Sequence, residues 1–130
     1  MATGRKYHTQ QVHYLRKALA YNTAATGVEV TVGTLPAGAL VIGAGAYIVT
    51  VFNAASTNVI DIGTSGDPDG FATDLAAGTV GNIVWDELAT SNDLYATTEV
   101  TVTANYAQTG TAATTGSAII YVTYLANNDG

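Results

Sequence analysis

The chain has 130 residues, of which 48% are apolar and only 11% are charged, and it contains no cysteine. This length suits one domain, and the low content of charged residues excludes a solvated helical bundle or a coiled coil. The absence of cysteine excludes disulfide scaffolds, zinc ribbons, iron–sulfur sites and thiol catalysis. We therefore expect a single, weakly charged β-domain.

The first 26 residues differ from the rest of the chain in charge and in pattern. All four cations and both histidines precede residue 18, whereas all ten carboxylates follow it. The apolar residues between Gln10 and Tyr21 have helix-like spacing, but the same segment also suits an extended arm. We predict a basic N-terminal arm and hinge over residues 1–26 and a β-sandwich domain over residues 27–130.

Opposite charges on arm and body favour docking of the arm on an acidic protein neighbour, with a mobile, solvated terminus as the alternative. The acidic body repels phosphate backbones, so no nucleic-acid partner is expected. The most apolar window, residues 37–52, is interrupted by glycines and is too short to cross a bilayer, so no membrane partner is expected. The first residues lack the apolar run of a cleaved leader.

From residue 28 onward apolar residues recur with a period of two, which is typical of half-buried strands. The clearest case is the segment Glu99 to Tyr106, in which Val100, Val102, Ala104 and Tyr106 alternate with polar residues. Glycines 43 and 45 are expected to form a flexible hinge, and residues 63–70 a loop. Short strands are predicted over residues 28–32, 40–42, 47–52, 59–62, 83–85, 94–95, 99–106 and 118–125. About eight short strands with turn signals at intervals of roughly 8–15 residues predict an all-β fold, an antiparallel sandwich of the jelly-roll type.

The segment Tyr47 to Phe52 is apolar on both faces, so it is either a central strand or a strand whose outer face meets another subunit. The tyrosines of the body favour subunit contacts over a ligand site. We predict that contacts to a partner or a second subunit use residues of this strand and of the arm: Arg5, Lys6, Tyr7, His13, Tyr14, Arg16, Lys17, Tyr47, Val49 and Val51.

The sequence contains no recognisable catalytic constellation. Both histidines lie on the predicted arm, and no serine stands in a Gly-x-Ser-x-Gly elbow. Asp86 and Glu87 are consecutive, so in a strand they point to opposite faces and cannot act on one substrate, and Trp85 is expected to fill the core. We therefore predict that the protein is not an enzyme and needs no cofactor.

The segment Asp67-Pro68-Asp69-Gly70 is the sharpest local candidate for a metal site. Two carboxylates two residues apart resemble part of a calcium loop, so Asp67 and Asp69 are the candidate ligands. The pattern lacks the bidentate Glu and the flanking helices of an EF-hand, and turn chemistry explains it equally: Pro68 sets one backbone angle and Gly70 supplies another. We favour a structural turn anchored by a buried Phe71, with calcium binding as the alternative.

The stretch Val59-Ile-Asp-Ile-Gly-Thr-Ser-Gly-Asp-Pro-Asp-Gly-Phe71 resembles a segment of small virion proteins of tailed bacteriophages. The turn Leu35-Pro36-Ala37-Gly38 and the apolar strand that ends in Phe52-Asn53 extend the resemblance over residues 27–75. It implies a head decoration or cement protein, made in the host cytoplasm, that sits on the capsid surface of the virion. Such a protein binds the major capsid protein, associates with itself as a trimer or dimer, and stabilises the head. Related β-domains also occur in head and tail fibres, so a receptor- or carbohydrate-binding module is the alternative. The resemblance transfers no catalytic residue.

Overall fold

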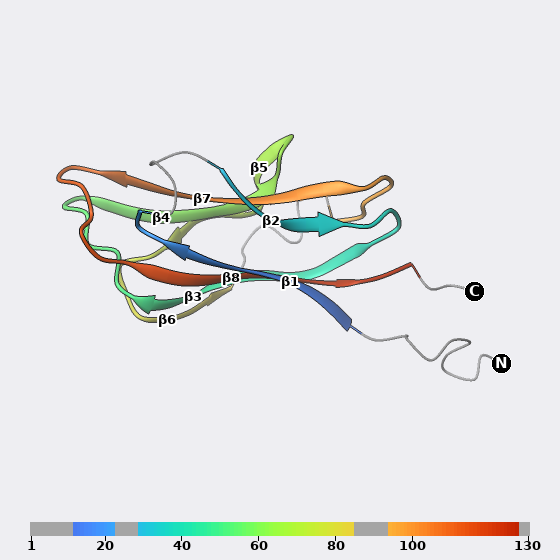
Figure 1. Ribbon diagram of the computed structural model, residues 1–130, viewed down its shortest axis with the longest axis horizontal. Helices are drawn as coiled ribbons and strands as arrows, with labels where there is room; N and C mark the ends of the chain where they lie inside the picture. Colours follow the sequence, from blue (N-terminus) through green and yellow to red (C-terminus); the bar gives the residue numbers. More distant parts are fainter. Residues whose placement is uncertain (1–11, 23–28, 85–93, 128–130) are drawn as a thin grey trace.

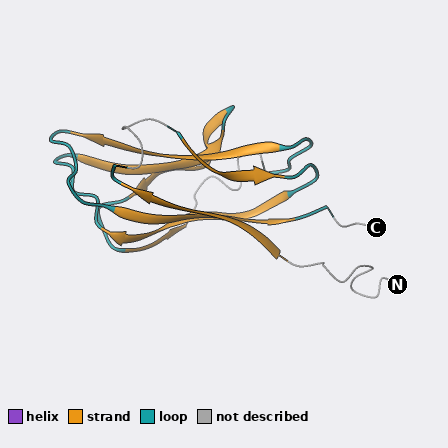
Figure 2. Ribbon diagram, in the orientation of Figure 1, coloured by secondary structure: helices purple, strands orange, loops and turns teal. Residues whose placement is uncertain are grey.

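Segments in which apolar side chains alternate with polar ones form β-strands throughout the computed structural model, which describes residues 12–22, 29–84 and 94–127 (Figure 1). Figure 2 shows only strands and loops over these ranges. No helix in them is long and apolar enough to span a membrane. The strands are β1 (Val12–Ala20), β2 (Val30–Leu35), β3 (Leu40–Thr50), β4 (Thr57–Thr64), β5 (Asp67–Ala76), β6 (Gly81–Val84), β7 (Val100–Thr109) and β8 (Ser117–Leu125).

The eight strands form two four-stranded sheets that face each other (Figure 1). Sheet A has the order β1-β8-β3-β6, and sheet B has the order β2-β7-β4-β5. All strand pairs are antiparallel. Two interlocked sheets of four strands in this order make a jelly roll. The predicted fold class, an antiparallel sandwich of the jelly-roll type, is confirmed.

The segment with ambiguous spacing before residue 22 is a strand of this sandwich. β1 pairs with β8 along its whole length, from Val12 opposite Leu125 to Ala20 opposite Ser117. Leu19 of β1 is buried in the core. The predicted arm over residues 1–26 therefore contains one strand of sheet A, while residues 1–11 and 23–28 lie outside the described ranges. Extended pairing is favoured because β8 offers a free edge of backbone donors and acceptors.

Two segments differ from their predicted conformation. The predicted hinge at Gly43 and Gly45 is wrong, because β3 is continuous through both glycines and only a register shift between Val41 and Gly43 interrupts its pairing with β8. The predicted loop over residues 63–70 is also wrong, since Asp67 to Gly70 begin β5 after a tight turn at Ser65. The two predicted strands at residues 40–42 and 47–52 are thus parts of one strand, and Tyr95 makes only an isolated bridge with Leu40.

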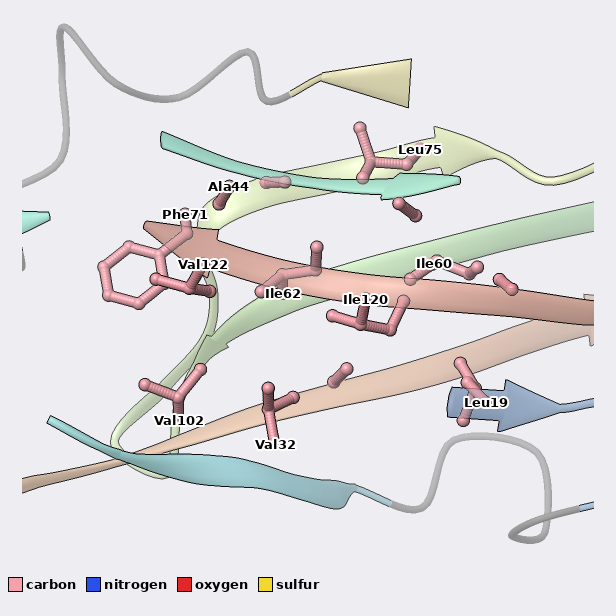
Figure 3. Close-up of a cluster of buried hydrophobic side chains, with 14 of the residues drawn as sticks. Leu19, Val32, Ala44, Ile60, Ile62, Phe71, Leu75, Val102, Ile120 and Val122 are labelled. Atoms are coloured by element: carbon pink, nitrogen blue, oxygen red, sulfur yellow. The ribbon is translucent and has the colours of Figure 1, made fainter. Parts of the chain in front are cut away.

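The core lies between the two sheets and is almost entirely aliphatic. Figure 3 shows Val32, Ile60, Ile62 and Val102 of sheet B facing Ile120 and Val122 of sheet A. Phe71 is fully buried among them, as expected for the anchor of its hairpin. Burial of each such large side chain stabilises the folded state by about 1.5–3 kcal/mol relative to exposure.

A polar contact ties the β3–β4 connection to sheet B at the edge of this core. Tyr106 of β7 is buried, and its ring packs on Phe52 with the ring centroids 4.5 Å apart. The Tyr106 hydroxyl donates a hydrogen bond to Asn58 Oδ1 at 2.5 Å. The same oxygen accepts the backbone N–H of Ala54 at 2.9 Å, and the Asn58 amide donates to the Ala54 carbonyl at 3.0 Å. Burial raises the pKa of the Tyr106 hydroxyl above its ordinary value, so it is a donor at neutral pH.

Candidate interaction surfaces

The outward side of sheet A carries rows of apolar side chains that cross three strands. β8 lies between β1 and β3, and its register places Leu125 between Val12 and Leu40. Near the other end of β8, Ile119 lies between Ala18 and Tyr47. Adjacent strands are about 4.8 Å apart, so each row forms a continuous contact surface.

Exposed apolar side chains of the described residues gather on this sheet. Seven of the nine large ones belong to its strands: Val12, Tyr14, Leu40, Ile42, Tyr47, Val49 and Leu125. We call the outward side of β1, β8 and β3, with these seven side chains, the sheet A face. The other two, Val80 and Tyr95, lie directly before β6 and in the bridge to Leu40. No strand of sheet B exposes a large apolar side chain. Contiguous apolar surface of this kind marks interaction sites in soluble proteins.

The described charged side chains are separated by sign between the two sheets. Within the described ranges the cations are Arg16 and Lys17, both exposed on β1 of sheet A. The carboxylates there belong to sheet B, on its strands or directly before them: Glu29, Asp61, Asp67, Asp69, Asp74 and Glu99. The described part of sheet A contains no carboxylate. The described part of the molecule is therefore polarised, with an apolar and basic sheet opposed to an acidic one.

The acidic charge concentrates on the β4–β5 hairpin. Asp61 Oδ1 accepts the backbone N–H of Asp74 at 2.7 Å, which holds Asp74 in a left-handed conformation with φ of 52°. Burial raises the pKa of the Asp61 carboxyl above its ordinary value. The hydrogen bond from Asp74 opposes this rise, while the nearby carboxylates of Asp74 and Asp69 add to it. The cluster is thus self-repelling at neutral pH.

Close backbone packing shapes this hairpin. The pairing of β4 with β5 is irregular between Ile60 and Thr64, so the start of β5 bulges over β4. A Cβ atom placed on Gly63 would lie 2.1 Å from the carbonyl oxygen of Asp67 and 2.5 Å from the carbonyl carbon of Pro68. Thr103, which pairs with Gly63 from β7, is buried, and its hydroxyl has no hydrogen-bond partner in the structure.

The candidate calcium ligands lie in this bulge. Asp67 and Asp69 are both exposed at the start of β5. The backbone N–H of Asp67 donates to Thr64 Oγ1 at 3.1 Å. The backbone carbonyl of Asp69 accepts a hydrogen bond from the Thr73 hydroxyl at 3.2 Å. These contacts are the turn chemistry expected from the sequence. Among the described residues no group of three or more Asp, Glu or His is placed to hold a metal ion. Calcium binding stays a prediction to be tested.

The structure brings most of the predicted contact residues to sheet A. Tyr14, Arg16 and Lys17 are exposed on β1, and Tyr47 and Val49 are exposed on β3. His13 stacks on Tyr124 of β8, with the ring centroids 5.6 Å apart, and is partly buried. Val51, after the end of β3, is partly buried as well. Arg5, Lys6 and Tyr7 lie outside the described residues, as does Trp85.

Sequence reasoning missed Ile119 and Leu125 of β8 and Val12 of β1 as parts of this surface. Ile119, Tyr121 and Leu125 lie on the outward side of β8, and Val12 extends their row onto β1. A signal was present, because Ala118 to Leu125 is apolar at nearly every position, as is Tyr47 to Phe52. Strands that are apolar on both faces are covered on both faces.

No protein-family model and no curated protein matches the sequence. Solved structures share its fold. The chain is similar to a chain of the cyanophage Pam1 capsid asymmetric unit, with a TM-score of 0.74 and 22% identity over 97% of this chain and 92% of that one. It is also similar to a chain in the acidic stable capsid of Helicobacter pylori bacteriophage KHP30, with a TM-score of 0.65 and 16% identity over 88% of this chain and 86% of that one. A chain of the Ralstonia phage GP4 capsid is similar as well, with a TM-score of 0.63 and 16% identity over 90% of this chain and 85% of that one.

Proposed function

We propose that the protein is a structural component of a tailed-bacteriophage virion, which binds the outer surface of the head as a homo-oligomer and stabilises it. In this proposal its partners are the major capsid protein and further copies of itself. It is made in the host cytoplasm and resides on the capsid surface. It acts as a decoration or cement protein and not as an enzyme.

The observation that carries this proposal is the likeness to chains of three phage capsids. Each likeness spans at least 88% of this chain and at least 85% of the other, so the entire sandwich is compared and not a shared hairpin. Folds of this size host many functions, so the fold alone does not assign one. The proposal gains support from the sequence segment Val59 to Phe71, which resembles small phage virion proteins independently of the fold.

The surfaces of the described residues suit a binding role. An unpartnered apolar sheet, with Arg16 on its outward side and Lys17 exposed on the same strand β1, gives sheet A the chemistry of a protein contact. The acidic side is turned away from it, and a negative outer surface keeps assembled particles soluble. The Asp61 carboxyl, whose pKa is raised by burial, accepts a backbone N–H of its own hairpin, and this hydrogen bond gives it a structural role.

Binding to phage heads tests the proposal. Purified protein, added to heads that lack it, should co-sediment at saturating and reproducible copy number. The double variant Arg16→Gln, Lys17→Gln should bind more weakly, because it removes the two described cations. The matched variant Glu29→Gln, Glu99→Gln neutralises two exposed carboxylates on the opposite sheet and should bind as the wild type does.

Two results would contradict the proposal. Absence of saturable binding to heads would remove the decoration role, and saturable binding to host cells or glycans instead would move the protein to the fibre class. Equal loss of binding in both double variants would show that Arg16 and Lys17 make no specific contact.

A further inference from the structure

The sheet A face is large enough to need a partner. Its strands β1, β8 and β3 contain nine, nine and eleven residues. With a rise of about 3.3 Å per residue and a strand spacing of about 4.8 Å, sheet A covers on the order of 500 Å² in plan. One partner contributes ~800 Å² of accessible surface to a standard interface, and the accessible area of this face exceeds its area in plan. Leaving this apolar area in water is unfavourable by about 25 cal/mol per Å².

The distribution of charged side chains limits which protein surface can pack on the sheet A face. The chain has a net charge of −6, so contact between copies is opposed by repulsion wherever carboxylates meet. All six described carboxylates belong to sheet B or directly precede its strands. The described part of sheet A has none, and its two described cations, Arg16 and Lys17, stand on the edge strand β1, so copies can approach one another over β8 and β3 without bringing carboxylates together.

Shape and polarity make the face its own best counterpart. An apolar surface is stabilised by a second apolar surface, and the described residues of this chain expose no other one. Two sheets packed face to face at about 10 Å is also how the core of this sandwich is built. Symmetric oligomers use such self-complementary patches.

We propose that the sheet A faces of neighbouring copies of this chain pack on one another around a symmetry axis, with the acidic sheets turned outward. This inference rests on the homo-oligomer of the proposed function and assigns it a surface. The contact includes Tyr47 and Val49 of β3 and the outward side chains of the neighbouring strand β8, Ile119 and Tyr121. Capsid binding then uses surfaces outside this contact, with Arg16 and Lys17 on the edge strand β1 left available to the capsid.

The oligomeric state of the full chain tests the inference directly. Sedimentation velocity over a hundredfold range of concentration should show a dimer for the wild type, because one face packed on its own copy is satisfied by two chains. Val49→Lys places a charge within the contact and should shift the protein to monomer, with at least a tenfold weaker association. Thr31→Lys adds the same charge at an exposed position of β2 in sheet B and should leave association unchanged. Circular dichroism of both variants checks that the fold is kept.

Thiol protection supplies a second readout that needs no disruptive change. The chain has no cysteine, so Val49→Cys and Thr31→Cys each introduce a unique label. The Val49→Cys thiol should react at least tenfold more slowly with a maleimide than the Thr31→Cys thiol, and dilution to monomer should remove the difference. Equal reaction rates in the oligomer would overturn the inference, as would a wild type that is monomeric throughout.

The outcomes separate this inference from the proposed function. A monomeric protein that binds heads would overturn the sheet A contact and leave a capsid-binding role. An oligomer that dissociates with Val49→Lys but never binds heads would retain the contact and remove the capsid role. High salt discriminates further, because an apolar contact persists in it while contacts between cations and carboxylates weaken.

Discussion

Replacing Gly63 with alanine is predicted to destabilise the protein by displacing the β4–β5 hairpin. The added Cβ would lie 2.1 Å from the Asp67 carbonyl oxygen, 2.5 Å from the Pro68 carbonyl carbon and 2.7 Å from the Gly70 nitrogen. All three are backbone atoms, so no side-chain rotation relieves the contact and β5 itself has to move. Gly63 does not have a positive φ, so the effect is one of contact and not of backbone conformation.

The magnitude follows from the cost of overpacking. Insertion of a methyl group into a packed site typically costs about 1–3 kcal/mol, and three backbone contacts place this one at the upper end. We expect the free energy of unfolding to fall by about 2–3 kcal/mol and the melting temperature by roughly 10 °C. Gly66, at the turn of the same hairpin, has no heavy atom within 4 Å of an added Cβ. Gly66→Ala should therefore change the stability by less than about 0.5 kcal/mol.

Chemical denaturation of both variants at one protein concentration measures the difference, because self-association would make stability depend on concentration. Amide hydrogen exchange should show faster opening of β5 in Gly63→Ala and unchanged protection in β8. Equal stabilities for the two variants would refute the close packing of the bulge against β4.

Three further outcomes are expected. Tyr106→Phe removes the hydroxyl that donates to Asn58, so unfolding experiments should show a loss of about 1 kcal/mol; an unchanged stability would contradict that contact. Asp61 has a raised pKa in the folded state, so the folded protein binds this proton more tightly than the unfolded chain, and stability falls as pH rises through the region above the ordinary Asp value. Asp61→Asn should keep the acceptor for the Asp74 N–H and flatten this pH dependence in thermal melts; a curve as steep as the wild type's would exclude Asp61 as its source. Calcium should leave the melting temperature unchanged, because this ion needs six to eight oxygen ligands, whereas a saturable rise that Asp69→Asn abolishes would establish a calcium site.

The sequence predicts the sandwich well wherever one face of a strand is polar. The segment 99–106 alternates strictly, and Val102, Ala104 and Tyr106 are buried as that alternation requires. The alternating pattern of such a strand predicts both its extended conformation and which of its faces is buried. Buried Phe71 was likewise predictable, since an aromatic residue after a polar turn has to be sheltered from water.

Segments whose conformation depends on tertiary pairing were not predictable. Residues 12–20 carry a weak pattern and become a strand because β8 supplies a partner edge. Gly43 and Gly45 suggest flexibility locally, yet pairing with β8 on one side holds both, and β6 pairs with Gly45 on the other. The start of β5 has turn residues, but Gly63 allows it to pack onto β4. Local propensity is overruled in each case by contacts distant in sequence.

The candidate surface could be predicted in part for the same reason. Tyr47 and Val49 were identified because their strand is apolar on both faces, and the cations of β1 because they stand alone in the sequence. That these residues share one sheet depends on the position of β8 between β1 and β3, which only the topology reveals. The separation of carboxylates onto sheet B is likewise a property of the fold.

Electron cryo-microscopy of phage heads incubated with the purified protein tests the central claim most directly. We predict regular density over the outer head lattice, with the sheet A faces of neighbouring copies packed together at each position. Density at the tail, or heads that stay bare at saturating protein, would contradict the assignment as a structural protein of the head surface.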